Sequence, residues 1–273
     1  MRLIIKNNYN DCAKWTADYI AAKIINAKPS IEKPFVLGLP TGSTPLGVYK
    51  RLIELNQKGI ISFKNVITFN MDEYVGLEAS HPQSYHYFMM ENFFNKIDIE
   101  KKNIHILDGM TDDPTGECRR YEEMITAAGG IDLFLGGCGC DGHIAFNEPG
   151  SSLTSKTRMK TLTEDTIAAN ARFFDGDTTK VPKTALTVGI GTITDAREVL
   201  IMMSGLSKAD ALQHAVEESV SQMWPVTILQ MHKSAILIAD DAATDKLRVG
   251  TVKYFSGIEA KIIDSYERIF ADK

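Results

Sequence analysis

Short, almost uninterrupted apolar runs alternate along the chain with longer stretches that place apolar residues three or four positions apart. The runs are typical of strands covered on both faces, and the longer stretches are typical of amphipathic helices. The predicted strands are Leu3–Ile5, Phe35–Leu39, Val66–Asn70, Ile104–Leu107, Ile131–Leu135, Ala185–Gly189, Val199–Met203 and Ala235–Ala239. The predicted helices include Asp11–Asn26, Pro45–Gln57, Ser84–Asn95, Thr115–Ala128 and Ser207–Ser219. This alternation indicates an α/β fold with a single doubly wound, mostly parallel sheet and helices on both faces.

Composition narrows the class of protein. The chain has 273 residues and no long linker, internal repeat or low-complexity tract, so we expect residues 1–273 to form one domain. A formal net charge of −5 provides no basic field for nucleic acid or an anionic membrane. The N-terminal apolar run is too short for a signal peptide, and no run reaches the roughly 18 residues of a membrane span. Four cysteines are too few for a disulfide scaffold, so we expect reduced thiols and a cytoplasmic protein.

The turn after the second predicted strand has the features of an anion site. Ligands of such sheets bind beyond the carboxyl ends of the strands, and Gly42, Ser43 and Thr44 follow this strand and precede a helix. Small residues let backbone N–H groups approach an anion, and the helix N-terminus adds a favourable dipole. The turn lacks the lysine of a P-loop and the glycine spacing of a dinucleotide fingerprint. Thr44 could also cap the helix, so a plain tight turn is the alternative.

Two adjacent carboxylates, Asp72 and Glu73, follow the third predicted strand. Neighbouring residues of an extended or turning segment point apart, so one side chain can face a site while the other is structural. A carboxylate above a strand end suits a general base that removes a C–H proton beside a carbonyl. The alternative is a solvated acidic loop.

The glycine-rich segment after the fifth predicted strand gathers Asp141, His143 and Glu148 within eight residues. Histidine protonates near neutral pH, and carboxylates beside it can orient the ring and hold its proton. The same three residues could instead bind a metal ion. A zinc site from Cys138 and Cys140 is disfavoured, because a second pair of ligands is missing.

Cations for an anionic ligand must be gathered locally in an acidic chain. Arg172 is one candidate, and Lys208 is another because it would begin a helix at a strand end. Each of these charges alone is more commonly a solvated surface group.

A second basic group lies beyond the histidine segment. Arg158 and Lys160 alternate, so in an extended segment they would project from one face. With the Ser151 and Thr161 hydroxyls they could form another anion site, and a solvated basic strand is the alternative.

Taken together, these segments resemble the glucosamine-6-phosphate deaminase family from Met1 to about Phe255. The segments that carry the resemblance are Leu37–Gly42, Thr68–Tyr74, Asp141–Pro149, Ala171–Phe174 and Ala185–Gly189. The resemblance implies a modified Rossmann-like fold. It also implies a hydrolase of amino-sugar catabolism that converts glucosamine 6-phosphate to fructose 6-phosphate and ammonia.

The resemblance also implies roles for the site residues. Asp72 matches the base that moves a proton between C2 and C1, and His143 matches the residue that opens the sugar ring, with Asp141 and Glu148 as its partners. The matching phosphate-binding positions are Gly42, Ser43, Thr44, Arg172 and Lys208. No metal or organic cofactor is implied, because the carbonyl of the opened substrate itself acidifies the C2 proton.

Regulated members of the family bind N-acetylglucosamine 6-phosphate as an activator between the subunits of a hexamer. The matching positions are Met1, Ser151, Arg158, Lys160, Thr161 and Tyr254, with Met1 supplied by a neighbour. The resemblance therefore implies an allosteric homohexamer. The chain departs from the family pattern at Cys138, at Cys140 and in the segment Ser221–Pro225, where Pro225 removes a backbone donor.

Two other functions must be distinguished from that of a deaminase. A 6-phosphogluconolactonase would share the fold and the Asp-Gly-His turn, but would not ordinarily carry Phe146–Pro149 or Met71–Tyr74. A non-catalytic sugar-phosphate sensor, like the effector domains of some repressors, should add a helix-turn-helix segment and a basic face. This sequence has neither feature.

Overall fold

Seven parallel strands form the central sheet of the protein, in the order β1-β10-β9-β6-β2-β3-β5. The structure is a computed structural model that describes residues 1–270, with the backbone alone described at 169 and 261–268. The strands are β1 (Arg2–Lys6), β2 (Phe35–Leu39), β3 (Val66–Asn70), β5 (Ile104–His105), β6 (Leu133–Gly137), β9 (Val199–Met203) and β10 (Ala235–Asp240). The predicted α/β sheet is confirmed, and residues 271–273 of the predicted single domain lie outside the described residues.

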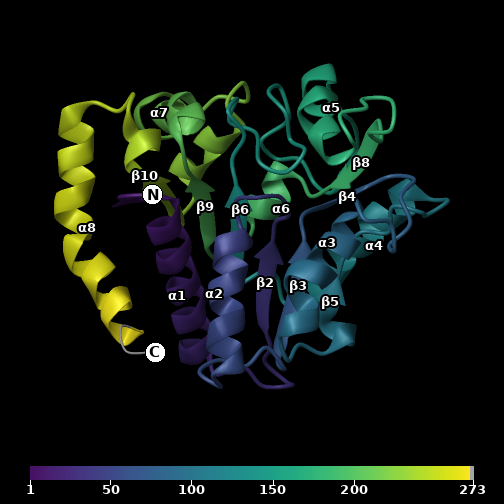
Figure 1. Cartoon of the computed structure of the whole chain (residues 1–273), viewed down its shortest axis with the longest axis horizontal. Helices are drawn as coiled ribbons and strands as arrows, with labels where there is room; N and C mark the ends of the chain where they lie inside the picture. The colour runs from purple at the N-terminus through teal and green to yellow at the C-terminus, as the bar shows by residue number, and fades with distance from the viewer. Residues whose placement is uncertain (271–273) are drawn as a thin grey trace.

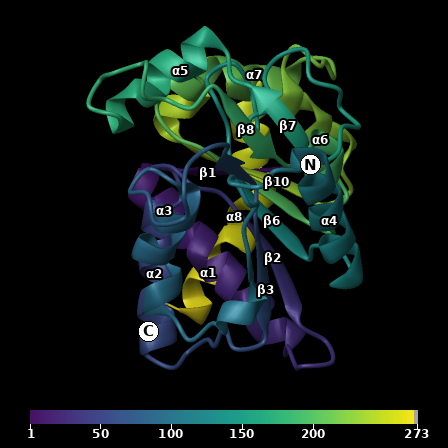
Figure 2. The same cartoon turned by 90° about the vertical axis from the view of Figure 1, so that its right-hand side faces the viewer.

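Helices cover both faces of this sheet (Figure 1). They are α1 (Tyr9–Ala27), α2 (Leu46–Gln57), α3 (Tyr85–Asn92), α4 (Pro114–Ala127), α5 (Glu164–Asn170), α6 (Ile190–Thr194), α7 (Ala209–Glu217) and α8 (Val249–Ile269). Figure 2 shows α1, α2 and α3 on one side of the strands and α4 on the other. Alternate residues of β9 accordingly enter different cores: Val199, Ile201 and Met203 pack in one, Leu200 and Met202 in the other. None of the described helices combines the length and apolar character needed to cross a bilayer.

The strand order reverses between β2 and β6. From β2 the chain proceeds to β3 and β5 on one side, whereas β6 lies on the other side of β2 and leads to β9 and β10. The connections that leave β2 and β6 therefore run in opposite directions, which opens a crevice beyond the carboxyl ends of these two strands. This crevice is where the fold predicts a ligand.

A second, antiparallel sheet stands above the first one, in the order β4-β8-β7. Its strands are β4 (Asp72–Tyr74), β8 (Thr184–Thr187) and β7 (Arg158–Thr161). The prediction that Ala185–Gly189 joins the main sheet was wrong, because this segment pairs with β4 and β7 instead. Strand β6 begins two residues later than predicted, since the Asp132 carboxylate accepts a hydrogen bond from the Val36 N–H at the start of the ladder.

The start of α2 differs from the prediction that Thr44 caps it. Pro45 is the N-cap residue, and the Gly47 N–H donates to the hydroxyl of Tyr9 on α1, at 2.9 Å. A side chain from a neighbouring helix thus satisfies a first-turn donor that sequence reasoning had assigned to Thr44.

Candidate active site

The turn after β2 lies beside the end of β6, at the reversal of strand order. Gly42 has a φ of 87°, a conformation that favours glycine. A Cβ added to Gly137 would lie 3.5 Å from the Thr44 side chain, so the turn closely approaches the last residue of β6. The Tyr9 hydroxyl donates to the Thr44 carbonyl at 3.0 Å, and this hydrogen bond ties the turn to α1. Gly42, Ser43 and Thr44 are therefore at the predicted crevice.

Asp72 is held at the same edge by backbone hydrogen bonds on both sides of Met71. The Met71 N–H donates to the Leu39 carbonyl at the end of β2, and the Val188 N–H donates to the Met71 carbonyl. The Asp72 side chain is only 6% exposed, and its Oδ1 has no hydrogen-bond partner among the described residues. Burial raises the pKa of this carboxyl well above its ordinary value, and the charge of Glu73 acts in the same direction.

Glu73 has a different environment from its neighbour. Its carboxylate accepts the backbone N–H groups of Tyr74, Tyr85 and His86 at 2.8–2.9 Å, two of them in the first turn of α3. Glu73 therefore anchors the N-terminus of a helix, where a negative charge is favourable. The expectation that one carboxylate of the pair is structural agrees with this geometry, and Asp72 is the one left without such partners.

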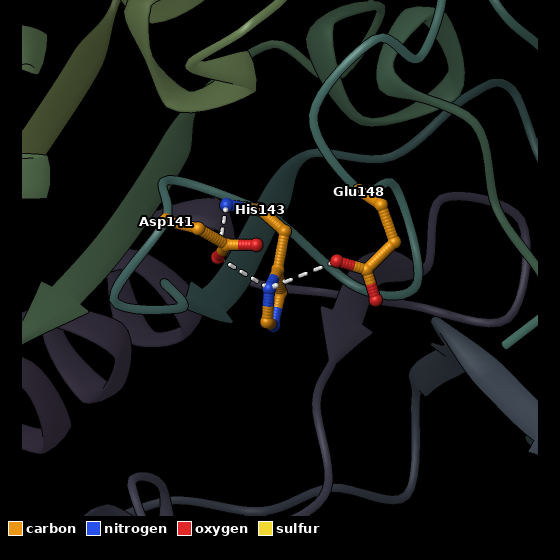
Figure 3. A group of neighbouring side chains, drawn as sticks. All are labelled: Asp141, His143 and Glu148. Atoms are coloured by element: carbon orange, nitrogen blue, oxygen red, sulfur yellow. Dashed lines mark hydrogen bonds and ion pairs between the residues drawn. The ribbon is translucent and has the colours of Figure 1, made fainter. Parts of the chain in front are cut away.

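The His143 ring lies between two carboxylates (Figure 3). Its Nδ1 is 2.7 Å from Asp141 Oδ1 and 3.7 Å from Glu148 Oε2, and the shorter contact meets the distance of a hydrogen bond but not its angle. Burial alone would raise the pKa of Asp141, yet its contacts with His143 prevail and lower that pKa to about 2. Asp141 is thus ionised at neutral pH and can stabilise positive charge that develops on the ring.

Close packing and hydrogen bonds fix the loop that carries His143. A Cβ added to Gly139 would lie 2.3 Å from the His143 ring, so a larger residue cannot fit there without displacement. The Phe146 N–H donates to the Thr187 hydroxyl at 3.2 Å, and the Asn147 side chain donates to the Val188 carbonyl at 2.8 Å. Because Thr187 pairs with Asp72 across the antiparallel sheet, β8 joins the histidine loop to the strand of the buried carboxylate.

Glu148 is 8% exposed, and its Oε1 accepts a hydrogen bond from the Thr166 hydroxyl at 2.5 Å. The ligand atoms of Asp141, His143 and Glu148 all lie within 4.8 Å of one another, so the group could also hold a metal ion. The contacts already made by Asp141 and Glu148 favour proton chemistry, and removal of divalent ions tests the choice.

Lys208 follows a turn at the end of β9. Asp240 accepts the Gly205 N–H at 2.9 Å, and Gly205 has a φ of 90°, so the turn is held by the neighbouring strand β10. The Lys208 charge acts on Cys138 in the histidine segment, although burial raises the pKa of that thiol to about 12. Lys208 is therefore close to the crevice, and Cys138 remains a protonated, inert thiol. Cys140 is exposed.

Arg172 is not brought to the crevice in the same way. It lies in a 3₁₀ helix, Ala171–Phe173, with an exposed side chain whose guanidinium carbon is 4.7 Å from the Phe173 ring centroid. Within residues 1–270, no hydrogen bond or ion pair joins Arg172 to Lys208 or to the turn after β2.

The second basic group occupies β7. Arg158 and Lys160 share its half-buried face, whereas Thr161 lies on the exposed face. Burial lowers the pKa of Arg158. Nearby in sequence, the Ser151 hydroxyl is buried without a hydrogen-bond partner among the described residues. Tyr254 is on α8, which packs against β1 at the edge of the main sheet, whereas β7 belongs to the second sheet.

Sequence reasoning missed the two threonines that support the site, Thr166 and Thr187. Thr187 lies in a segment that carries the family resemblance but was given no role there. Thr166 follows Glu164 and Asp165, and nothing in that local sequence indicates its contact with Glu148. The departure at Pro225 has a simple explanation. This proline is the first residue of a 3₁₀ helix, Pro225–Met231, where its missing N–H would have no intrahelical partner anyway.

The fold and the site define an α/β enzyme with a buried carboxylate and a carboxylate-flanked histidine beyond the carboxyl ends of the strands. The sequence pattern described as glucosamine-6-phosphate isomerases/6-phosphogluconolactonase matches residues 7–238, and the chain belongs to this family.

Individual relatives are more specific than the family. A glucosamine-6-phosphate deaminase from Treponema denticola is 69% identical over 265 residues, which are 97% of this chain and 98% of that one. The solved structure of a monomeric glucosamine-6-phosphate deaminase is 40% identical, with a TM-score of 0.86 over 91% of this chain and 100% of its own. A 6-phosphogluconolactonase from Trypanosoma cruzi is 20% identical, with a TM-score of 0.71 over 90% and 96% of the two chains, and supports the fold alone.

The raised pKa of Asp72 predicts a pH-dependent effect of Asp72→Asn on stability. As pH rises above about 4, the unfolded carboxyl ionises, whereas the folded one keeps its proton until the pH reaches its own, higher pKa, so over this range the wild-type protein loses stability relative to acidic conditions. The variant lacks this titration. Its free energy of unfolding in urea, compared with wild type, should therefore improve as pH rises from about 4.5 towards neutrality.

Asp141→Asn is the matched control, because the pKa of Asp141 is lowered rather than raised. Near pH 5, above the titration of Asp141 and below that of an ordinary histidine, this variant should be less stable than wild type by a nearly constant amount. A difference that is independent of pH for Asp72→Asn would contradict the assignment of Asp72 as a carboxyl whose pKa rises on folding.

Proposed function

We propose that this chain deaminates glucosamine 6-phosphate to fructose 6-phosphate and ammonia, as a hydrolase of a C–N bond in amino-sugar catabolism. The observation that carries the proposal is the meeting of two acid–base groups at one crevice: the buried Asp72 and the His143 group with its two carboxylates. The 69% identity to a deaminase supports the same substrate. Four described cysteines without disulfides fit a reducing, cytoplasmic compartment.

Ring opening is the first step that the geometry supports. The His143 ring can take the proton of the C1 hydroxyl and return one to the ring oxygen, which breaks the C1–O5 bond and gives an open-chain aldehyde. Ionised Asp141 stabilises the imidazolium that forms in between, and Glu148 lies on the other side of the ring.

Proton transfer between carbons is the second step, and we assign it to Asp72. The aldehyde acidifies the C2 proton, Asp72 removes it to give an enolamine, and the same carboxyl returns the proton to C1. The product is a C2 imine, which water hydrolyses to the ketone and ammonia. A base with a raised pKa suits the removal of a weakly acidic C–H proton, because driving force grows as the two pKa values approach one another.

The rival lactonase reaction makes no use of this arrangement. Hydrolysis of a lactone needs an activated water but no group that carries a proton between adjacent carbons. The buried Asp72 is therefore better explained by isomerisation. A non-catalytic sensor has no need of a titratable histidine between two carboxylates.

Ammonia release from glucosamine 6-phosphate tests the reaction directly. We expect the wild-type protein to form ammonia and fructose 6-phosphate in equal amounts, before and after dialysis against EDTA. Asp72→Asn should lower kcat roughly 10²–10⁴-fold, because a general base typically contributes that much. Release of 6-phosphogluconate from its lactone without ammonia from the amino sugar would overturn the proposal.

We assign the substrate phosphate to Gly42, Ser43, Thr44, Arg172 and Lys208. The turn after β2 and the segment before Lys208 follow β2 and β9, the two strands that flank β6. Arg172 would have to approach from its exposed position when the ligand binds, which is common for residues on connecting segments.

Lys208→Met should therefore weaken phosphate binding. A hydrogen bond to a charged group is worth about 1.5–3 kcal/mol, so KM for glucosamine 6-phosphate should rise roughly tenfold or more. The control is Lys246→Met, since Lys246 pairs with Asp210 on the surface. Binding of unphosphorylated glucosamine should be unaffected by either change, and an equal loss for both sugars would show that Lys208 is structural.

We further propose an activator site for N-acetylglucosamine 6-phosphate at β7 in a homohexamer. Arg158 and Lys160 provide cationic groups on one face, and the buried, unpartnered Ser151 hydroxyl suits a ligand contact. Thr161 would contribute from its exposed side. Tyr254, 62% exposed on α8, would contribute as well, together with the Met1 amino group of a neighbouring subunit. Because one solved glucosamine-6-phosphate deaminase is monomeric, the number of subunits in this protein has to be measured directly.

The small sheet gives this site a physical connection to the base. Arg158 on β7 and Asp72 on β4 both pair with Thr187 of the central strand β8. An anion that moves β7 would therefore move β8 and β4 with it. An activator that binds one arrangement of this sheet better than the other shifts the population towards that arrangement.

Lys160→Ala should remove activation and leave the basal reaction intact. Wild-type saturation should be sigmoidal with substrate alone and hyperbolic with saturating activator, whereas the variant should be sigmoidal in both conditions. Met159→Ala, on the opposite face of β7, should behave as wild type. Hyperbolic kinetics with no response to the activator, or a monomer in sedimentation, would contradict the proposed activator site. Neither result would contradict the proposed reaction.

A further inference from the structure

The Glu148 carboxylate depends on a residue from outside the histidine loop. Among the described residues, the only hydrogen bond to its side-chain oxygens comes from the Thr166 hydroxyl, at 2.5 Å from Oε1. The other oxygen, Oε2, is the one that lies 3.7 Å from His143 Nδ1. A carboxylate that is 8% exposed needs such a partner, because burial without hydrogen bonds is costly.

The direction of this hydrogen bond is set by the start of α5. Thr163 caps the helix by accepting the Thr166 N–H, and its own hydroxyl donates to Thr166 Oγ1 at 3.0 Å. A hydroxyl has a single proton to donate. With its oxygen already accepting from Thr163, Thr166 directs that proton to Glu148.

Thr166 belongs to a segment, residues 162–183, that packs apart from the two main cores. This α5 segment buries Ile167 and Phe174 in a small cluster with Tyr74 of β4 and Phe146 of the histidine loop. Asn170 also donates to the Tyr74 hydroxyl at 2.9 Å. The α5 segment therefore packs against Tyr74, two residues after Asp72, and against Phe146, two residues before Glu148. The same segment carries Arg172.

We propose that Thr166 is a positioning residue that holds Glu148 beside His143 and makes the place of this carboxylate depend on the seating of the α5 segment. The proposal rests on the proposed function, in which Glu148 supports ring opening by His143. Contact of Arg172 with a substrate phosphate would then affect the position of Glu148, because Arg172 and Thr166 belong to the same short segment.

The test is a double-mutant cycle with Thr166→Val, which keeps the shape and removes the hydroxyl, and Glu148→Ala, which removes the acceptor. Thr166→Val should lower kcat about tenfold, the effect of a lost hydrogen bond to a charged group, with KM changed less than twofold. Thr166→Ser should restore most of the turnover. In the Glu148→Ala background, Thr166→Val should cost less than twofold, because the residue through which it acts is gone.

Thr179→Val is the matched control, since Thr179 lies in the same segment but donates to Asp177 on the surface. It should behave as wild type. An equal loss from Thr166→Val in both backgrounds would show a general structural role and overturn the proposal, as would wild-type turnover of Thr166→Val itself.

Amide hydrogen exchange separates this proposal from the deaminase assignment, because it needs no turnover. Thr166→Val and Glu148→Ala should each speed exchange in residues 164–170, and the double variant should exchange no faster than the faster single one. Additive increases would overturn the coupling even if ammonia is released. If exchange is coupled but wild-type protein releases no ammonia, the positioning contact stands and the proposed reaction fails.

Discussion

The reversal of strand order between β2 and β6 is the constraint from which the site follows. Each parallel strand ends at the same edge of the sheet, but at this position the outgoing connections separate and leave the edge open. The turn with Gly42 and the end of β6 at Gly137 then approach each other closely enough that a side chain at Gly137 would meet Thr44. A second sheet placed above this edge brings Asp72 over the same opening.

Three carboxyl groups at this opening acquire different properties from their surroundings. Among the described residues, Asp72 has no ion pair and no donor for its Oδ1, and burial raises its pKa. Asp141 touches the His143 ring and has a pKa of about 2. Glu148 is also buried, but its Oε1 accepts a hydrogen bond from the Thr166 hydroxyl. Groups of one chemical type can thus serve as base, counter-ion and positioned partner, which is how environments divide acid and base roles.

The sequence predicted the parts of the site that stand at the ends of apolar strands. The bounds of β2, β3 and β9 are as predicted, and the residues after them lie where the fold requires a ligand. Strands β4 and β7 were not predicted, because three or four residues of mixed polarity have no apolar run and exist only by pairing with β8. The left-handed conformation of Ala145, with a φ of 54°, and the reach of Thr166 to Glu148 also depend on contacts between distant segments. Neither feature can be predicted from the local sequence pattern.

The small antiparallel sheet explains why so much of the site depends on such distant contacts. Thr187 of β8 pairs with Asp72 on one side and with Arg158 on the other, and its hydroxyl accepts the Phe146 N–H of the histidine loop. Asp72, the histidine loop and the basic strand therefore share one residue, Thr187, that is fully buried and has no charge of its own. Because β8 is hydrogen-bonded to both outer strands, a displacement of β4 or β7 must either move β8 or break these hydrogen bonds. The position of the buried carboxylate on β4 therefore depends on how β8 is held by the basic strand on its other side.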